Sequence, residues 1–253
     1  MRHGPVQSRF LSQFRGRVRA WRCGAGHTTW RHPAGARRYL LTPLCALLLA
    51  SCGTSRTGPE IRDAPPAALP SAEPGPEAVA ILAGGCFWTV EAVFSHVRGV
   101  KAVEAGYHGG TTRQARYELV TSGLTDHAEA VRIVYDPAVV RYDQLLRIHM
   151  GTAHDPAQMG GQGPDRGSEY RSAIIPVTPH QARIAGAYLT QLAEMKPTTR
   201  IEPYRAFYPA ENAHQDFARR HPAHSYVRKW DAPRIAALAR LYPQAYSGGW
   251  TAR

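Results

Sequence analysis

A stretch rich in proline, alanine, serine and glycine, residues 53–76, limits where this 253-residue chain can build a folded domain. Such a sequence has too little apolar surface to offset the entropy lost on ordering. We therefore predict a disordered tether over residues 52–77. The one folded domain is then expected over residues 78–253, which is long enough to bury a sizeable core.

The segment before the tether is typical of an export signal. Arg37 and Arg38 precede an apolar run that is too short to span a bilayer and that ends in Leu49-Ala50-Ser51-Cys52. Small residues directly before Cys52 resemble a bacterial lipoprotein signal, in which this cysteine is lipidated and becomes the mature N-terminus. Residues 1–51 are thus predicted to be an N-terminal extension plus a lipoprotein-type signal peptide. An ordinary signal peptide with a chance cysteine is the alternative.

Lipidation at Cys52 also predicts a location. The domain would be exported, on the periplasmic side of a membrane, and held there by the lipid alone. Gly53 follows Cys52, and the absence of an aspartate at this position resembles lipoproteins of the outer membrane. We therefore expect an outer-membrane anchor.

The net charge of +12 would normally suggest a nucleic-acid partner. Residues 1–51, however, contain nine arginines, no lysine and no acidic residue, which leaves 22 basic against 19 acidic residues from Cys52 onward. A net charge of +3 on the remaining chain gives no reason to expect nucleic acid. The basic character belongs to the leader.

Cysteine usage singles out one thiol. Cys23 and Cys45 lie in the predicted leader and Cys52 would carry lipid, so Cys86 is the thiol left in the mature domain. Exported proteins usually pair their cysteines in structural disulfides, and a lone cysteine cannot do so. Cys86 is therefore either a small core residue or a functional one.

Periodicity in the folded domain predicts interleaved strands and helices. We expect strands at 77–85, 99–110, 127–137, 170–178 and 199–203, a polar glycine-rich loop at 160–167, and helices at 86–97, 142–156 (stopping near Gly151), 178–195, 212–219 and 232–241. This order lacks the regular alternation of a doubly wound sheet. It favours an α+β fold with an antiparallel or mixed sheet.

Cys86 lies where the first strand meets the first helix. Free N–H groups and the helix dipole at such a position favour a thiolate. Phe87 and Trp88 follow and point about 100° apart on a helix, so one can enter the core while the other forms a wall for a small apolar group.

Four polar residues are weaker candidates. Glu129 shares one face of an apolar strand with Val131 and Ile133, where burial would raise its pKa and let it donate a proton near neutral pH. A paired or edge-strand charge is the alternative. The other three flank turns and could equally serve packing or turn formation: Tyr117, Asp165 and Tyr170. The histidines show no metal-ligand spacing, so we predict no metal.

Several motifs together resemble one enzyme family. In order along the chain they are GGCFWTVEAVF, GYHGG, HAEAVRIVYDP, HDPAQ, QGPDRGSEYRSAI and ENAHQDF. Their order and spacing, from about Val79 to past Phe217, are similar to peptide methionine sulfoxide reductases of the A type (the MsrA family). The resemblance implies a two-layer ferredoxin-like domain with long added loops, preceded by the signal and the tether.

The resemblance also implies roles for the candidate residues. Cys86 would attack the sulfur of an S-epimer methionine sulfoxide, free or in proteins. Phe87 and Trp88 would hold the substrate methyl group, and Glu129 would protonate the sulfoxide oxygen. The remaining implied residues are two tyrosines that hydrogen-bond this oxygen and one substrate-orienting carboxylate: Tyr117, Tyr170 and Asp165.

The chain departs from the family pattern in several respects, which include Asp126, Gly160-Gly161 and Asn212-Ala213. Thr89 stands where glycine is usual, Glu169 stands where glutamine is common, and the C-terminal segment lacks the resolving cysteines of many members. A Cys86 sulfenic acid would therefore be reduced by an external thiol, from a thioredoxin-like protein or a small thiol. We expect no cofactor and a monomeric protein.

Two other functions remain open from the residues alone. One is a different cysteine-dependent enzyme, a hydrolase or peroxidase, using Cys86 with His127 or His154. The other is a non-catalytic surface lipoprotein that binds oxidised methionine segments.

Overall fold

The computed structural model describes residues 60–251. The predicted signal segment, Cys52 and the first residues of the predicted tether lie outside this range. Between residues 60 and 251, no helix is long and apolar enough to cross a membrane. The strands of the main sheet are β1 (Ala78–Gly84), β2 (Val100–His108), β3 (Ala128–Tyr135), β6 (Ser172–Ile175), β7 (Arg200–Ile201) and β8 (Phe207–Pro209).

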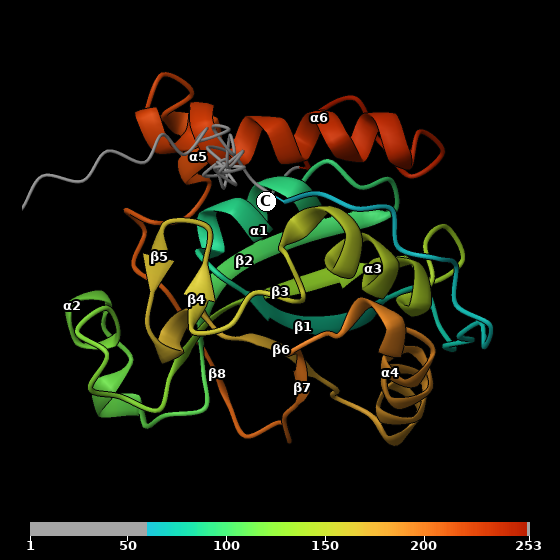
Figure 1. Ribbon diagram of the computed structural model, residues 1–253, viewed down its shortest axis with the longest axis horizontal. Helices are drawn as coiled ribbons and strands as arrows, with labels where there is room; N and C mark the ends of the chain where they lie inside the picture. Colours follow the sequence, from blue (N-terminus) through green and yellow to red (C-terminus); the bar gives the residue numbers. More distant parts are fainter. Residues whose placement is uncertain (1–59, 252–253) are drawn as a thin grey trace, which may run out of the picture. The chain divides into compact units, whose positions relative to one another are not determined.

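The sheet has the order β7-β6-β1-β3-β2-β8 (Figure 1). Its neighbouring strands are antiparallel except β6 and β7, which are parallel. Helix α1 (Phe87–Phe94) connects β1 to β2, and α3 (Tyr142–Ile148) lies between β3 and β6. The central order β6-β1-β3-β2 with these two helices is the ferredoxin-like split βαβ arrangement. The predicted α+β class and ferredoxin-like core are confirmed.

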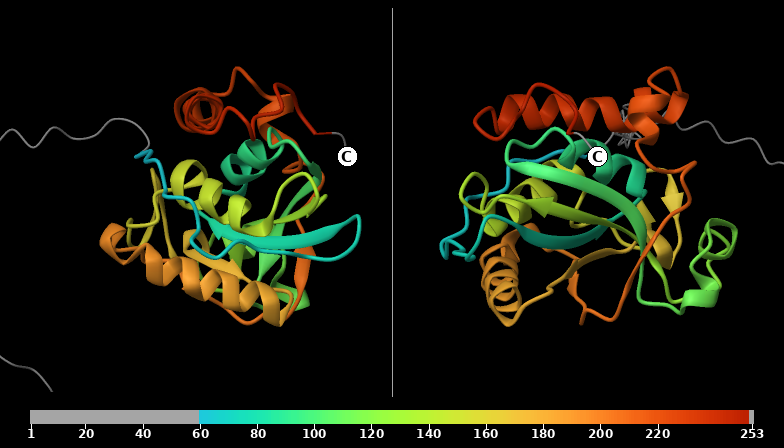
Figure 2. Two further views of the ribbon diagram at one scale, coloured as in Figure 1. Left: turned by 90° about the vertical axis from the view of Figure 1, so that its right-hand side faces the viewer. Right: turned by 180° about the vertical axis from the view of Figure 1, so that it is seen from behind.

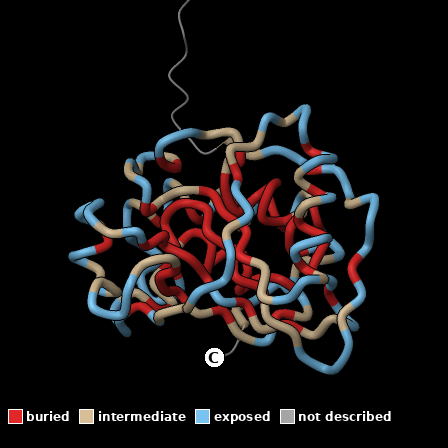
Figure 3. Tube along the Cα trace, turned by 90° about the horizontal axis from the view of Figure 1, so that it is seen from below, coloured by how far each residue is buried: buried red, intermediate tan, exposed pale blue. Residues whose placement is uncertain are grey.

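The alternation along β3 sends its side chains to the two faces of the sheet. Val131 and Ile133 belong to the large buried cluster that contains residues of α1 and α3, whereas Ala128 and Ala130 belong to a smaller cluster on the other face. Buried residues accordingly concentrate in the middle of the domain, and exposed residues lie in the outer loops (Figure 3). Glu129 lies on the face of Val131 and Ile133, as its sequence position predicts.

A second set of helices surrounds this core. Helix α6 lies over α1, on the side of α1 away from the sheet, and α4 packs against α3 (Figure 2). The remaining helices are α2 (Tyr117–Val120), α4 (Pro179–Gln191), α5 (Phe217–Arg220) and α6 (Ala232–Leu241), and a single turn of wider helix, η5 (Val227–Asp231), leads into α6.

Several local features differ from the sequence predictions. The loop at 160–167 contains a small hairpin of β4 (Gly161–Gln162) and β5 (Asp165–Arg166), and α2 and β8 were not predicted. The helix expected at 212–219 is only the short α5. The helix expected to stop near Gly151 continues as the wide turn η2 (His149–Ala153). Each of these short elements is positioned by contacts to residues distant in sequence.

The prediction of a disordered tether is wrong for residues 60–77, which we call the strap. The strap lies in extended form against α3, α4 and the end of α6 (Figure 1). Side chains of these helices bind its backbone: Asp143 accepts from Ser71, Arg147 and Tyr188 donate to the carbonyls of Ala64 and Pro65, and Tyr242 accepts from the N–H of Ala64. Hydrogen bonds to its polar backbone hold this segment, and Ala64 adds apolar burial because it lies in the main hydrophobic core.

Candidate active site

Cys86 occupies the turn between β1 and α1, as the sequence predicts, and is the N-cap residue of α1. The turn requires glycine before it: Gly85 has φ of +90°, and a Cβ there would lie 2.5 Å from the side chain of Gln162. This close approach packs the β4–β5 hairpin against the turn. Only 9% of the Cys86 side chain is exposed.

The surroundings of Cys86 favour its thiol form. Burial raises the pKa of Cys86 well above its ordinary value, and the nearby carboxyl groups of Glu129, Asp165 and Asp231 raise it further. The backbone N–H of Trp88, at the start of α1, acts in the opposite direction but does not compensate. The expectation that the helix start makes Cys86 a thiolate is therefore wrong for the resting protein, because desolvation and nearby carboxylates outweigh the helix terminus.

Glu129 on β3 is the buried acid that the strand pattern predicts. Its side chain is 1% exposed, and Oε2 accepts a hydrogen bond of 2.9 Å from the backbone N–H of Phe87. Burial raises the pKa of Glu129 to about 8; the Phe87 N–H lowers it, and Asp165 and Glu169 raise it. Glu129 is thus mostly protonated at neutral pH. Its hydrogen bond to Phe87, the residue that follows Cys86, holds this acid close to the thiol.

The other predicted polar residues converge on the same point from separate elements. Tyr117 begins α2, Asp165 lies on β5, and Tyr170 ends the short helix η3 (Ser168–Tyr170). Burial, then Glu129, Cys86 and Asp165, raise the pKa of Tyr117 to about 12. The same groups raise the pKa of Tyr170, again after burial. Both phenols are protonated donors facing the thiol and the two acids.

Phe87 and Trp88 differ in burial. Phe87 is fully buried and stacks on Tyr117 with ring centroids 6.4 Å apart. Trp88 is half-buried; Phe217 stacks on its indole at 3.6 Å, and the ring of Tyr226 meets it edge-on at 5.9 Å. Phe87 therefore belongs to the core, and Trp88 keeps some exposed apolar surface close to Cys86.

Tyr226 is a site residue that the sequence interpretation missed. Its hydroxyl donates a 2.6 Å hydrogen bond to Oδ2 of Asp165. Burial raises the pKa of Asp165, and the Tyr226 hydrogen bond lowers it. Nothing in the local sequence around Tyr226 marks it, because its partner lies 61 residues away.

A second missed group positions Tyr117. Glu211 accepts hydrogen bonds from the Tyr107 hydroxyl at 2.8 Å and from the backbone N–H of Tyr117 at 3.0 Å. The imidazole of His214 stacks on the Tyr117 ring at 3.9 Å. Both Glu211 and His214 lie in the ENAHQDF motif, which was a usable signal although no role was assigned to these two residues.

Two histidines that a cysteine hydrolase would need are occupied elsewhere. His154 is fully buried between the carbonyl of His149 and the hydroxyl of Ser172, and its pKa falls to about 3 because of burial. The ring of His127 bonds the backbone at residues 110 and 111. Neither ring is free to serve as the base of a thiol–histidine pair.

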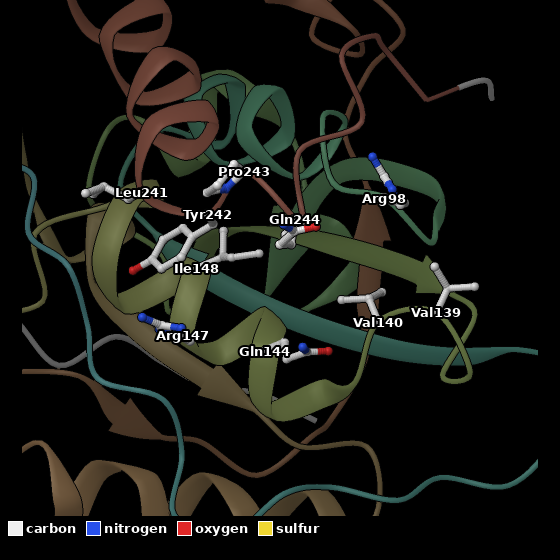
Figure 4. A pocket seen from close by; sticks show the side chains of 11 residues that line it. Arg98, Val139, Val140, Gln144, Arg147, Ile148, Leu241, Tyr242, Pro243 and Gln244 are labelled. Carbon is white, nitrogen blue, oxygen red and sulfur yellow. The ribbon is translucent and has the colours of Figure 1, made fainter.

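The domain also has a separate pocket of about 350 Å³ between α3 and the chain after α6 (Figure 4). Arg98, Arg147 and Tyr242 are among its lining residues, and none of the predicted site residues lines it. Within residues 60–251, no group of three or more His, Cys, Asp and Glu side chains is arranged to hold a metal ion.

Comparison with known proteins identifies related sequences over most of the described domain. The family model of peptide methionine sulfoxide reductase matches residues 78–244. Peptide methionine sulfoxide reductase MsrA 2 of Synechocystis is 50% identical over 168 residues, which cover 64% of this chain and 78% of that protein. MsrA 2 of Mesorhizobium japonicum is 48% identical over 181 residues, 70% of this chain and 92% of that protein.

Solved structures agree with these matches. Methionine sulfoxide reductase A of Corynebacterium diphtheriae superimposes with a TM-score of 0.52 and 30% identity over 66% of this chain and 88% of that chain. Reduced Mxr1 of Saccharomyces cerevisiae superimposes with a TM-score of 0.54 and 27% identity, covering 62% of this chain and 92% of that chain.

Proposed function

Because the chain belongs to the peptide methionine sulfoxide reductase family, and is therefore an enzyme that reduces methionine sulfoxide, we propose that Cys86 and Glu129 carry out its reaction. The substrate is the S-epimer of methionine sulfoxide, free or within proteins. The observation that carries this proposal is the hydrogen bond between Glu129 and the Phe87 N–H, which holds a protonated acid beside the nucleophile.

The apolar wall and the tyrosines orient the substrate. Phe87 and Trp88 receive the methyl group, while the hydroxyls of Tyr117 and Tyr170 donate hydrogen bonds to the sulfoxide oxygen. Asp165, itself held by Tyr226, orients the rest of the substrate. These contacts place the substrate sulfur next to the Cys86 sulfur.

The chemical step removes one oxygen from the substrate and leaves the proton count unchanged. The Cys86 sulfur attacks the substrate sulfur as Glu129 gives its proton to the sulfoxide oxygen, and the resulting carboxylate accepts the thiol proton. Protonation by Glu129 then lets the oxygen leave as water, which leaves a sulfonium in which the Cys86 sulfur is bonded to the substrate sulfur. A water molecule attacks the Cys86 sulfur, gives its proton to Glu129 and breaks this S–S bond, so that methionine is released and Cys86 becomes a sulfenic acid. A raised pKa suits both groups, because Glu129 must hold a proton and Cys86 need ionise only during attack.

Regeneration uses an external thiol. No cysteine follows Cys86 in the sequence, and within residues 60–251 Cys86 is the one free cysteine. A thiol R–SH attacks the sulfenic acid to give a mixed disulfide and water, and a second thiol releases Cys86. A thioredoxin-like dithiol protein of the same compartment, or a small thiol, fits this requirement.

A single turnover tests this function. One equivalent of S-epimer sulfoxide, added without reductant, should give one methionine per chain, and dimedone should then add to Cys86 because the sulfenic acid has no internal partner. Mass spectrometry of the Cys86 peptide measures the adduct. The R-epimer is the matched control and should remain unreacted.

Two outcomes would contradict the proposal. Equal consumption of both epimers would contradict a site that is specific for the S-epimer. A Cys86–Cys52 disulfide in place of the adduct would overturn both the regeneration route and the lipidation of Cys52.

The location is also part of the proposal. Residues 1–51 serve as a lipoprotein-type signal, and Cys52 carries the lipid that holds the domain on the periplasmic side of the outer membrane. The supporting observations are the apolar run before Leu49-Ala50-Ser51-Cys52 and Gly53 after it.

Mass spectrometry of the mature N-terminus checks this assignment. The expected product begins at Cys52 and carries acyl chains, and a Cys52→Ala variant should be recovered without lipid. An unmodified Cys52 in a soluble fraction of cells expressing the full chain would refute it.

A further inference from the structure

Asp231 is a buried carboxyl group that the proposed reaction does not use. It ends η5, directly before α6, and it has no exposed surface. Its Oδ1 accepts a 2.5 Å hydrogen bond from the hydroxyl of Thr89. Thr89 is itself buried and lies in the first turn of α1, which Cys86 caps. One short hydrogen bond therefore joins the C-terminal segment to the turn that carries the nucleophile.

The second oxygen of Asp231 has no hydrogen-bond partner among the described residues. Arg234, one turn further along α6, is also buried, but its Nη1 donates to the carbonyl of Thr152 at 2.8 Å. A buried carboxylate with one neutral donor and a free oxygen is costly to maintain.

Asp231 is close enough to Cys86 to affect its ionisation. Burial is the main cause that raises the pKa of Cys86, and three carboxyl groups from separate elements raise it further: Glu129 from β3, Asp165 from β5 and Asp231 from η5. The tyrosines that face the thiol are Tyr117, Tyr170 and Tyr226. Of the three carboxyl groups, Glu129 has a role in proton transfer and Asp165 is held by Tyr226. Asp231 is the one left with no role toward the substrate.

We infer that Asp231 is a positioning residue that, locked in place by Thr89, keeps Cys86 in its thiol form between turnovers. This inference rests on the proposed role of Cys86 as the nucleophile.

The titration of Asp231 fits this role. Burial raises the pKa of Asp231 to about 7, while the Thr89 hydrogen bond and Arg234 lower it and Asp165 raises it. The carboxyl is therefore largely ionised at pH 8, where a cysteine would otherwise begin to ionise. An anion at this position opposes the appearance of a second anion on Cys86.

A protonated Cys86 thiol reacts differently with hydrogen peroxide and with methionine sulfoxide. Hydrogen peroxide reacts with the thiolate: the thiolate displaces hydroxide from the peroxide and becomes a sulfenic acid, and a second peroxide converts this to a sulfinic acid that thiols do not reduce. A bound sulfoxide needs no thiolate beforehand, because Glu129 exchanges protons during the attack. Asp231 thus favours the sulfoxide over peroxide in a chain with no cysteine after Cys86 to trap the sulfenic acid.

The test measures the reactivity of Cys86 directly, on the full chain. At pH 8, Asp231→Asn should speed alkylation of Cys86 by iodoacetamide about tenfold, and peroxide inactivation by a similar factor, because one negative charge is gone. Mass spectrometry of the Cys86 peptide resolves this thiol from the others. Glu194→Gln, which removes one charge from an exposed site in the helix η4 (Ala193–Met195), is the matched control and should react like the wild type.

Thr89 variants test the hydrogen bond. Thr89→Val removes the donor, which raises the pKa of Asp231, lowers its ionised fraction and should also speed alkylation. Thr89→Ser keeps the hydroxyl and should behave as the wild type. The double variant with Asp231→Asn should match the single Asp231→Asn variant, because both changes act through the same charge. Thr89→Val provides the measurement even where Asp231→Asn does not fold.

Unchanged alkylation rates from pH 6 to 9 in Asp231→Asn, or in Thr89→Val where only that variant folds, would overturn the inference. Alkylation does not depend on turnover. Failure of the wild type to reduce methionine sulfoxide would instead overturn the proposed function and would be seen separately.

Discussion

Replacing Cys86 with serine should give a folded protein with no measurable reduction of methionine sulfoxide. A serine hydroxyl is far less nucleophilic toward sulfur than a thiol, and an oxygen in its place cannot form a sulfenic acid. The change preserves the volume at the junction of β1 and α1, where the side chain is almost buried. Methionine formation with excess dithiothreitol is the measurement.

The matched control is Ser95→Ala, which changes a buried hydroxyl at the other end of α1 and should keep most of the activity. Thermal unfolding of both variants shows that they fold. If the Cys86→Ser protein still formed methionine at more than a trace rate, another residue would have to be the nucleophile.

Replacing Glu129 with glutamine should slow the reaction by about 10²–10⁴-fold, the usual contribution of general acid catalysis. Glutamine keeps an oxygen that can accept a hydrogen bond from the Phe87 N–H. The substitution therefore removes the acidic proton and preserves the position of the side chain. In the wild type, activity should fall as the pH rises through about 8, because Glu129 then loses the proton that it must donate. The Glu129→Gln variant should lack this fall.

Glu104→Gln, on β2, is the matched control, since this glutamate pairs with Arg132 away from the site and its loss should change the rate less than twofold. Stability provides a second readout. The pKa of Glu129 is higher in the folded than in the unfolded chain, so the free energy of unfolding should fall as pH rises from about 4 to about 8. Glu129→Gln should remove this slope, and wild-type rates in this variant would exclude Glu129 from the mechanism.

The main secondary structure was predictable because its signals are local. An apolar run followed by Gly84-Gly85 marks the end of β1, and the spacing from Phe87 to Phe94 marks α1. The alternation in β3 also placed Glu129 on the covered face of the sheet. These patterns depend on residues within a single element, so no knowledge of the tertiary fold was needed.

Features that depend on distant contacts were not predictable. The strap has the composition of a disordered segment, and it is ordered because Asp143, Tyr188 and Tyr242 bind its backbone from three helices. Periodicity and composition carry no information about such partners.

The site shows the same division. Cys86, Glu129 and the aromatic pair follow from local pattern, whereas the bonds from Tyr226 to Asp165 and from Thr89 to Asp231 join residues 61 and 142 positions apart. The direction of the Cys86 pKa was wrong for a related reason. The helix start is visible in the sequence, but the burial of the thiol and the distance to the carboxyl groups beside it depend on the tertiary fold.

With the proposed lipid on Cys52, order in the strap would limit how far the domain extends from a membrane. With the strap held against the domain from residue 60, residues 53–59 remain between the proposed lipid on Cys52 and the folded protein. At about 3.5 Å per residue, these seven residues span at most about 25 Å. The catalytic domain would then be confined to a thin layer next to the bilayer and would not diffuse through the whole compartment. Which oxidised proteins it repairs would be decided by whether they come to that surface, before any recognition at the site begins.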